Sequence, residues 1–382
     1  MRSALTQNRR SFLATCLGAG AMLRAYGTDK KGSEMKVSER QLDEERKAIR
    51  KAWLDLLGPF PEAKPALKPE QERVEDIQGL ECHRVTFQSE PDDRVPGLLL
   101  LPKHIEGKSP AILCIHPTTH GAGKRLVTGL SGRASDEPPL TPEQGGAYAL
   151  ELARWGYVTL SIDLICDGER IPPGEIRYDT RWFYQRHPEW SAVGKNIWDV
   201  MRAVDFLHTL DFIDTSRIAC IGHSLGGHTS LFAAAFEPRI AAAVCNGGVY
   251  SWVRDEQHWY RFEKEPRAPV DSYVYIKRFR PYLEDRGKPV PADFDGLMTL
   301  CAPRPLLLMQ TESEFKRDDT ATKAARAAET YRLLDAGDRI TTFTYPGEHN
   351  YPPVAKRFSF AWLDRWFHHT PAVPSIWPNQ VL

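Results

Sequence analysis

The chain has 382 residues, of which 42% are apolar, 10% aromatic and 26% charged, and its 50 basic residues balance its 50 acidic residues. This apolar and aromatic content excludes a disordered chain, and a balanced charge without a basic run excludes a protein that binds nucleic acid through its phosphates. Since no stretch of about 18 consecutive apolar residues occurs, no segment after the N-terminus is expected to cross a membrane.

Residues 1–27 have the composition of an export signal. They contain four arginines and no acidic residue, and a short, mildly apolar stretch runs from Phe12 to Leu23. The pair Arg9-Arg10 before that stretch resembles a twin-arginine signal, which is recognised by a receptor. We therefore expect an exported protein, periplasmic or secreted. Without residues 1–27 the chain has 46 basic and 50 acidic residues, a mildly acidic net charge of −4.

Residues 28–69 are predicted to be a polar N-terminal lead-in with one helix. That helix is expected from Glu44 to Leu57, because Gly58-Pro59 would end it. Residues 70–382 are predicted to form a single domain, because no linker or internal repeat divides them. Three segments without a clear place in a sheet, residues 125–144, 169–194 and 250–295, are expected to build a small cap and the walls of a cleft.

Within residues 70–382, apolar runs of strand length alternate with helical patterns. Such alternation is typical of an α/β protein with a mostly parallel sheet and helices on both faces. The predicted strands are residues 97–101, 111–115, 157–162, 217–221, 240–245, 305–309 and 340–345. The predicted helices are residues 147–155, 197–210, a segment directly after Ser224, 321–334 and 358–367.

The segment after the predicted strand 217–221 has the pattern of a nucleophile elbow. It reads Gly222-His223-Ser224-Leu225-Gly226-Gly227 and leads into a helical run. In a G-x-S-x-G sequence the serine lies on a tight turn between strand and helix, and the flanking glycines let the backbone turn sharply. Ser224 is therefore the candidate nucleophile.

A serine hydroxyl needs a base within hydrogen-bonding reach, and that base is oriented by a carboxylate. His349 lies in a turn-rich loop directly after the last predicted strand and is the candidate base. The acid is expected after strand 305–309. Glu314 is the first candidate there, and Asp318 or Asp319 are the alternatives.

An oxyanion that develops on the substrate needs two backbone N–H donors. The residue after the serine, Leu225, is expected to supply one, and the loop after strand 111–115 the other. Because Pro117 has no N–H, the second donor is predicted to be Thr118, with Thr119 as the alternative.

Aromatic residues crowd the segment from residue 182 to residue 190. Trp182 and Tyr184 are candidates for a platform that stacks on a sugar or an aromatic group, although packing within the cap would explain them as well. His223, next to the nucleophile, is expected to line or pack the elbow and is the third candidate for substrate binding.

No metal or other cofactor is predicted. The cysteines show no CxxC pattern and no Cys/His spacing typical of zinc, so they are interpreted as small core residues. His116 and His120 are four residues apart, but a proline lies between them and no acidic residue joins them.

Together these motifs resemble the α/β-hydrolase superfamily, and more narrowly its dienelactone hydrolase and acetyl xylan esterase-like branch. The similarity covers about residues 95–367 and implies a serine hydrolase with Ser224 as nucleophile and His349 as base. Two features depart from the family. Glu314 stands where most relatives have aspartate, and the loop after strand 111–115 reads HPTT instead of the HGGG of lipases. The segments that carry the resemblance are residues 114–119, 163–170, 222–227, 304–307 and 345–349.

The leading hypothesis is a serine hydrolase that cleaves carboxylic esters, short acyl or acetyl esters carried on small molecules or carbohydrates, through an acyl-enzyme. One alternative is a serine peptidase or amidase on the same fold. Another is a binding protein that has kept the fold without the chemistry. The sequence predicts neither the acyl group nor an oligomeric state.

Overall fold

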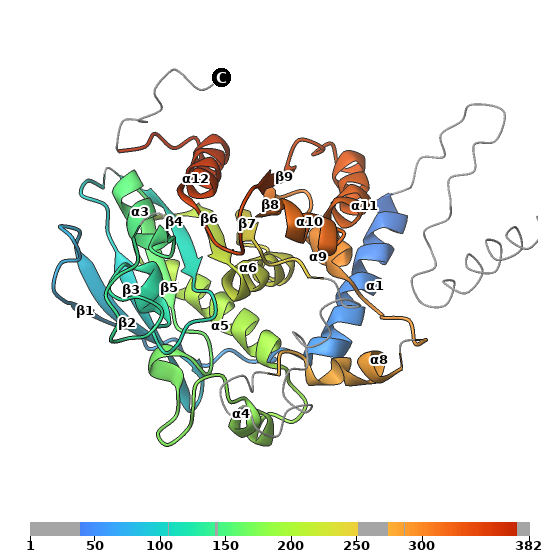
Figure 1. Cartoon of the computed structure of the whole chain (residues 1–382), viewed down its shortest axis with the longest axis horizontal. Coiled ribbons are helices and arrows are strands. Elements are labelled where there is room, and N and C mark those ends of the chain that lie inside the picture. Colours follow the sequence, from blue (N-terminus) through green and yellow to red (C-terminus); the bar gives the residue numbers. More distant parts are fainter. Residues whose placement is uncertain (1–38, 106, 142–143, 251–273, 286, 373–382) are drawn as a thin grey trace, which may run out of the picture.

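The computed structural model describes residues 39–105, 107–141, 144–250, 274–285 and 287–372 (Figure 1). The predicted export signal, residues 1–27, lies outside the described residues. The lead-in helix is α1 (Glu39–Leu57), which starts earlier than expected and ends at Gly58 as expected. Its Trp53 is fully buried and packs edge-on against Phe232, at 4.8 Å between ring centroids. The lead-in helix is therefore part of the core of the domain.

A single sheet of nine strands forms the centre of the domain, in the order β1-β2-β3-β5-β4-β6-β7-β8-β9. The first three strands and β5 pair antiparallel, and the strands from β5 across to β9 pair parallel. The predicted α/β fold with a mostly parallel sheet is confirmed. The strands are β1 (Glu70–Arg73), β2 (Cys82–Glu90), β3 (Asp93–Leu100), β4 (Ser109–Ile115), β5 (Val158–Ile162), β6 (Ile213–His223), β7 (Ala242–Asn246), β8 (Leu306–Thr311) and β9 (Ile340–Tyr345).

All the predicted strands are present, but β1 and β2 were not predicted. Strand β1 consists of four exposed polar residues, so it carries no hydrophobic signal, and it forms only because β2 pairs with it. Strand β2 alternates between buried and more exposed residues at its start and is charged or polar at several positions. Both strands are stabilised by pairing, β1 at the edge with β2 and β2 with β1 and β3, more than by their own propensity.

The predicted helices are also confirmed, as α3 (Tyr148–Trp155), α5 (Ala192–Leu207), α6 (Leu225–Phe236), α11 (Thr320–Leu333) and α12 (Pro353–Phe367). The helices that were not predicted are short: α2 (Lys124–Val127), α4 (Arg181–Arg186), α8 (Arg280–Glu284), α9 (Phe294–Cys301) and α10 (Glu312–Arg317). Segments of four to eight residues cover too few turns for a helical period to show in the sequence.

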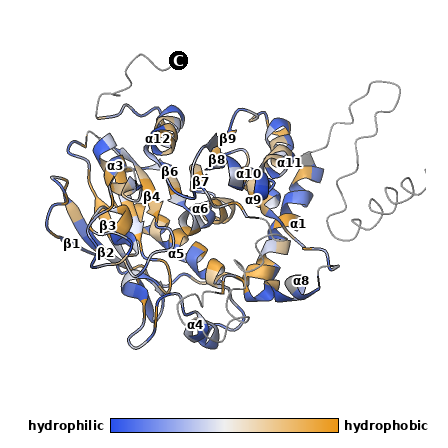
Figure 2. Ribbon diagram, in the orientation of Figure 1, coloured by the Kyte–Doolittle hydropathy of each residue, from blue (hydrophilic) through white to orange (hydrophobic). Residues whose placement is uncertain are grey.

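Alternate residues of the strands face two different layers of helices. Leu113 and Ile115 of β4 join the larger core with helices α1, α5, α6, α9 and α11. Ile112 and Cys114 join the smaller core with α3 and α12. Figure 2 shows the central strands as predominantly hydrophobic, whereas α1 carries residues of both kinds. This is the three-layer arrangement that the continuous apolar strands predict.

The six cysteines of the described residues are buried and have free thiols, as expected for small core residues. Burial raises the pKa of these thiols, so they are poorly reactive. Within the described part of the chain, no helix combines the length and the apolar character that a membrane span requires. The carboxyl ends of the parallel strands β4 to β9 share one edge of the sheet, and the candidate site lies there.

Candidate active site

Ser224 follows β6 and directly precedes α6. Its backbone has φ 56° and ψ −120°, a conformation that residues other than glycine rarely adopt and that costs on the order of 1–3 kcal/mol. A side chain at Gly222 would collide with the backbone of Gly226, and one at Gly226 would collide with the carbonyl of Ile115. The two glycines of the motif are thus required for the turn. Ser224 is partly exposed, whereas its neighbours on both sides are buried.

His349 and Glu314 come together from two different strand ends. His349 lies in the loop after β9, and Nδ1 of its ring is 2.5 Å from Oε1 of Glu314, in the first turn of α10 after β8. Burial alone would raise the pKa of Glu314, but the hydrogen bond and charge of His349 together with the donors of Thr311 lower it overall. The carboxylate is therefore charged at neutral pH and fixes the orientation of the imidazole.

The two alternative acids make other contacts. Asp318 is buried, pairs with Arg317 at 2.8 Å and lies 3.4 Å from the side-chain nitrogen of Gln310. Asp319 is exposed and accepts a hydrogen bond from Thr322. The structure thus brings Glu314 to His349, and Asp318 and Asp319 remain in contacts near the start of α11.

The loop that carries His349 is held to the nucleophile elbow by Asn246, at the end of β7. The backbone carbonyl of Asn246 accepts from the N–H of Ser224 at 2.8 Å, and its side-chain oxygen lies 2.7 Å from the hydroxyl of Tyr345. Its side-chain nitrogen contacts the Asn350 carbonyl at 3.2 Å and Nδ1 of His223 at 2.9 Å. A single residue therefore contacts both the strand end of the nucleophile and the loop of the base.

His223 and Gly247 flank the imidazole of His349. The ring centroids of His223 and His349 lie 4.6 Å apart. Burial, the neighbouring His349 and the charge of Arg133 lower the pKa of His223 well below its usual range, so its ring is neutral. Gly247 has φ 60°, and a Cβ atom there would lie 2.9 Å from Cε1 of His349. His223 thus packs the elbow, and Gly247 leaves the space that the base occupies.

Tyr250, just after β7, is a further residue at the nucleophile. Its side chain is buried, and its hydroxyl interacts with the side chain of Ser224 closely enough to affect the pKa of the phenol. Burial raises its pKa well above the usual range, so the hydroxyl keeps its proton. Sequence reasoning missed Asn246, Gly247 and Tyr250 because they lie at or just after the end of β7, a strand end that holds none of the residue types sought.

The structure distinguishes between the two candidate oxyanion donors of the loop after β4. The N–H of Thr119 donates to the hydroxyl of Tyr178 at 2.7 Å and is therefore occupied. The N–H of Thr118 has no such partner among the described residues. The N–H of Leu225 lies in the first turn of α6, where backbone donors have no partner within the helix. Close contact between Gly226 and the carbonyls of Ile115 and His116 brings the two segments together.

His116 fixes the peptide that contains the Thr118 N–H. Its Nδ1 contacts the carbonyl of Pro117 at 2.7 Å, and its Nε2 accepts from the N–H of Leu164 at 3.0 Å. In a trans peptide the C=O and N–H point in opposite directions. Because His116 holds the Pro117 carbonyl, it also sets the direction of the Thr118 N–H.

Asp167 and Tyr178 hold the same loop from the other side. Asp167 is buried, and its carboxylate accepts from the hydroxyls of Thr119 and Tyr178 and from the N–H of Gly121. Asp163 is also buried, and its carboxylate accepts from the backbone N–H groups of Lys124 and Glu169 and pairs with the Lys124 ammonium at 2.5 Å. Both acids therefore serve to hold loops in place.

The aromatic segment lies on and around α4. Tyr184 is buried, and its hydroxyl contacts the carbonyl of Val274 at 2.8 Å. Trp182 is half-buried and packs edge-on against Phe183. The placement of Tyr184 fits the packing role that was the alternative to a sugar platform, because neither its ring face nor its hydroxyl is exposed.

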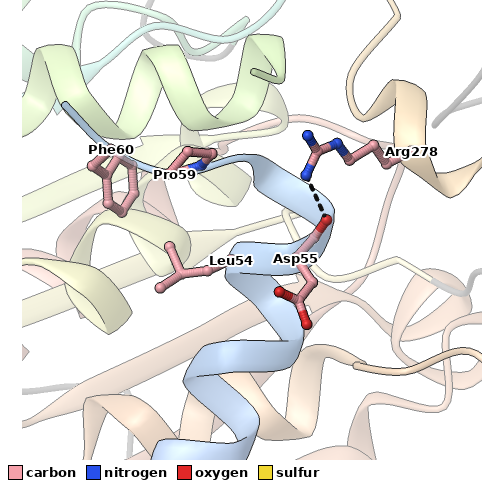
Figure 3. A pocket seen from close by; sticks show the side chains of 5 residues that line it. All are labelled: Leu54, Asp55, Pro59, Phe60 and Arg278. Carbon is pink, nitrogen blue, oxygen red and sulfur yellow. Dashed lines mark hydrogen bonds between the residues drawn. The ribbon is translucent and has the colours of Figure 1, made fainter. Parts of the chain in front are cut away.

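A separate hollow of about 380 Å³ lies at the C-terminal end of α1 (Figure 3). The guanidinium of Arg278 points across it and donates to the carbonyl of Asp55 at 3.0 Å. It contains no nucleophile or base and none of the residues that surround Ser224, so it is distinct from the candidate active site. The hollow is lined by Leu54, Asp55, Pro59, Phe60 and Arg278.

Comparison with known proteins finds relatives that carry the names of esterases and hydrolases. Residues 176–334 match the family of fungal glucuronyl esterases, a stretch that includes Ser224 and Glu314 and covers less than half of the chain. The chain is 31% identical over 157 residues to the carbohydrate esterase MZ0003 of an unknown prokaryotic organism, covering 39% of this chain and only 35% of that protein. It is 28% identical over 308 residues to YtaP of Bacillus subtilis (strain 168), which carries the name hydrolase, covering 75% of this chain and 90% of YtaP.

Solved structures with the same fold are also esterases by name. The glucuronoyl esterase of Solibacter usitatus superposes with a TM-score of 0.68 at 18% identity, over 91% of this chain and 99% of that one. A Bacteroides fragilis protein described as an acetyl xylan esterase superposes with a TM-score of 0.60 at 21% identity, over 82% and 77%. At these identities the likeness shows the α/β-hydrolase fold.

Proposed function

Because the chain is an α/β-hydrolase with relatives among carbohydrate esterases, we propose that it is a serine hydrolase of carboxylic esters. The substrates would be short acyl or acetyl esters, on small molecules or on carbohydrates. The observation that carries this proposal is the 2.5 Å contact between His349 and Glu314, together with the strained nucleophile-elbow conformation of Ser224.

In the proposed reaction Oγ of Ser224 attacks the ester carbonyl carbon while His349 accepts the hydroxyl proton. Glu314 stabilises the imidazolium that forms. The negative charge on the carbonyl oxygen is bound by the N–H groups of Leu225 and Thr118, with the N-terminus of α6 adding its positive dipole. The C–O bond to the alcohol then breaks, and the alcohol leaves with the proton from His349.

Water completes the cycle by the same steps. His349 removes a proton from water, the hydroxide attacks the acyl carbon, and the bond to Ser224 breaks as the serine recovers its proton. Residues of this chain alone supply the base, its orienting acid and the oxyanion donors in this scheme.

The proposal is tested with purified protein on a matched panel of acetylated sugars, p-nitrophenyl acetate and the corresponding anilide. Wild type is expected to cleave the esters and to be labelled by a fluorophosphonate. Ser224→Ala is expected to lose the labelling, and its kcat on the esters should fall by a factor of at least about a thousand. Full activity of Ser224→Ala would contradict the proposal, faster cleavage of the anilide would favour the amidase, and a folded but inert wild type would favour a binding protein.

We also propose export by the twin-arginine route, on the basis of Arg9-Arg10 and the composition of residues 1–27. A double substitution, Arg9→Lys with Arg10→Lys, should keep the protein inside the cell if the pair is read by the receptor. Export of that variant at the wild-type rate would contradict the proposal.

A further inference from the structure

Arg133 is a cation at the edge of the candidate site whose charge is not neutralised. It is exposed, and no carboxylate of the described residues lies within ion-pairing distance of it. Its Nη1 donates to the carbonyl of Thr118 at 3.3 Å, the residue whose N–H is the proposed oxyanion donor. The charge of Arg133 also helps to lower the pKa of His223, whose ring packs against that of His349.

The loop around Arg133 is built in place and fastened to the oxyanion loop. The N–H of His120 donates to the Arg133 carbonyl at 2.7 Å, and Ala134 forms bridges with His120 and Gly121. A turn closes the loop, because the N–H of Gly132 donates to the Glu137 carbonyl at 3.0 Å. The backbone of Arg133 is thus fixed relative to Thr118.

A guanidinium has five N–H donors in a planar fork, and the contact with Thr118 uses one of them. The remaining donors suit a carboxylate, which guanidinium groups bind with two parallel hydrogen bonds. The acids of the adjoining loops are already engaged: Glu137 accepts from the N–H of Ala134 at 3.1 Å, and Asp167 accepts from Thr119 and Tyr178. A negative group for Arg133 would therefore have to come from outside the described chain.

We infer that Arg133 is a specificity residue that binds a carboxylate of the substrate, so that the enzyme prefers acidic esters over neutral ones of the same shape. This inference rests on the proposed function for its site, and it adds the charge of the substrate. The carboxylate would lie close to the scissile ester, because Arg133 contacts the residue that supplies an oxyanion donor.

The test uses two acetyl esters that differ only in charge, 4-acetoxyphenylacetate and 4-acetoxyphenylacetamide. Wild type should have a kcat/KM about tenfold higher for the carboxylate at low salt, because charge-assisted hydrogen bonds are roughly twice as strong as neutral ones. This preference should shrink at 0.5 M salt. Arg133→Gln should bring the ratio of the two kcat/KM values close to one, and Arg133→Lys should keep part of it.

Arg84→Gln is the matched control, because Arg84 is exposed on β2 and likewise has no ion pair among the described residues. It should keep the wild-type ratio. An unchanged ratio in Arg133→Gln, or a wild type without preference for the carboxylate, would overturn the inference while leaving ester hydrolysis itself intact.

A binding measurement separates this inference from the proposed function. The Ser224→Ala protein should bind 4-hydroxyphenylacetate more tightly in calorimetry than the Ser224→Ala, Arg133→Gln protein does, whether or not either ester is hydrolysed by wild type. Equal affinities would overturn the role of Arg133 without reference to catalysis.

Discussion

Ser224, His349 and Glu314 depend on neighbours that hold them in place. Ser224 is held by its backbone bond to Asn246, and Asn246 also contacts the Tyr345 hydroxyl and the Asn350 carbonyl of the loop that carries His349. Glu314 serves at the same time in a capping box with Thr311 at the start of α10. The orientation of the carboxylate is thus set by the helix that it begins.

At this scale we predict that Glu314→Gln lowers kcat by about a hundredfold or more, since an amide cannot stabilise the imidazolium as a carboxylate does. Glu312→Gln is the matched control, because Glu312 is exposed in the same turn of α10. Asp318→Asn should also cost far less than Glu314→Gln. The reverse ranking of the two rates, measured with p-nitrophenyl acetate, would move the acid to Asp318.

We further predict that Gly247→Ala lowers kcat strongly, because the added methyl group would lie 2.9 Å from Cε1 of His349 and displace the ring. The control is Gly79→Ala. Gly79 also has a positive φ, 80°, but a Cβ atom there meets no atom within 4 Å. Both variants should lose a similar amount of stability, on the order of 1 kcal/mol for the strained backbone. Equal activity of the two variants would show that the space over Gly247 does not matter.

At the scale of elements, the site lies where loops from separate strands are fastened to one another. The loop after β4 supplies Thr118, and the segment after β5 holds it through Asp167 and Tyr178. Helix α1 is fastened in a comparable way: Trp53 packs in the core, and the guanidinium of Arg46 donates to the Ala302 carbonyl at 2.7 Å. The elements that looked peripheral in the sequence are therefore part of the framework.

Tyr178→Phe tests the fastening of the oxyanion loop. Removal of the hydroxyl leaves the N–H of Thr119 without its acceptor, so the neighbouring Thr118 N–H should lose its fixed direction. We expect kcat to fall about tenfold with little change in KM, because an oxyanion donor acts mainly in the transition state. Tyr157→Phe is the control, since the hydroxyl of Tyr157 contacts Asp364 of α12 and not the oxyanion loop. A fall in KM alone, or an equal loss in both variants, would contradict this role.

At the scale of the whole molecule, the burial of a histidine makes the fold sensitive to acid. His228 is fully buried in α6 among aromatic rings, and burial lowers its pKa from 6.5 to about 3. Because the pKa is lower in the folded state, the unfolded state binds more protons below pH 6.5. The stability that this group contributes is complete above that pH and is lost as the pH falls toward 3.

We predict that His228→Leu reduces this acid sensitivity. At pH 5 protonation of the unfolded His228 should cost the wild type about 2 kcal/mol of unfolding free energy relative to pH 7.5. The variant should lack that loss, whatever its stability at pH 7.5. Urea unfolding at pH 7.5, 6.5, 5.5 and 5.0 measures the slopes, and parallel curves for the two proteins would contradict the prediction.

The sequence by itself determined the α/β architecture, the place of Ser224 and the loop of His349. These follow from local patterns, which act within a few residues of chain. The patterns are apolar runs, a G-x-S-x-G turn and a loop after the last strand. It missed β1, whose residues carry no hydrophobic signal, the partly polar strand β2, and helices too short to show a period.

Only the tertiary structure shows that Glu314, and not Asp318, contacts His349, and that the N–H of Thr119 is occupied by Tyr178. It also brought Asn246, Gly247, Tyr250 and Arg133 to the site. The reason is that each of these depends on which atom lies within about 3 Å of another, and the partners come from strand ends and loops that are up to about a hundred residues apart in the chain.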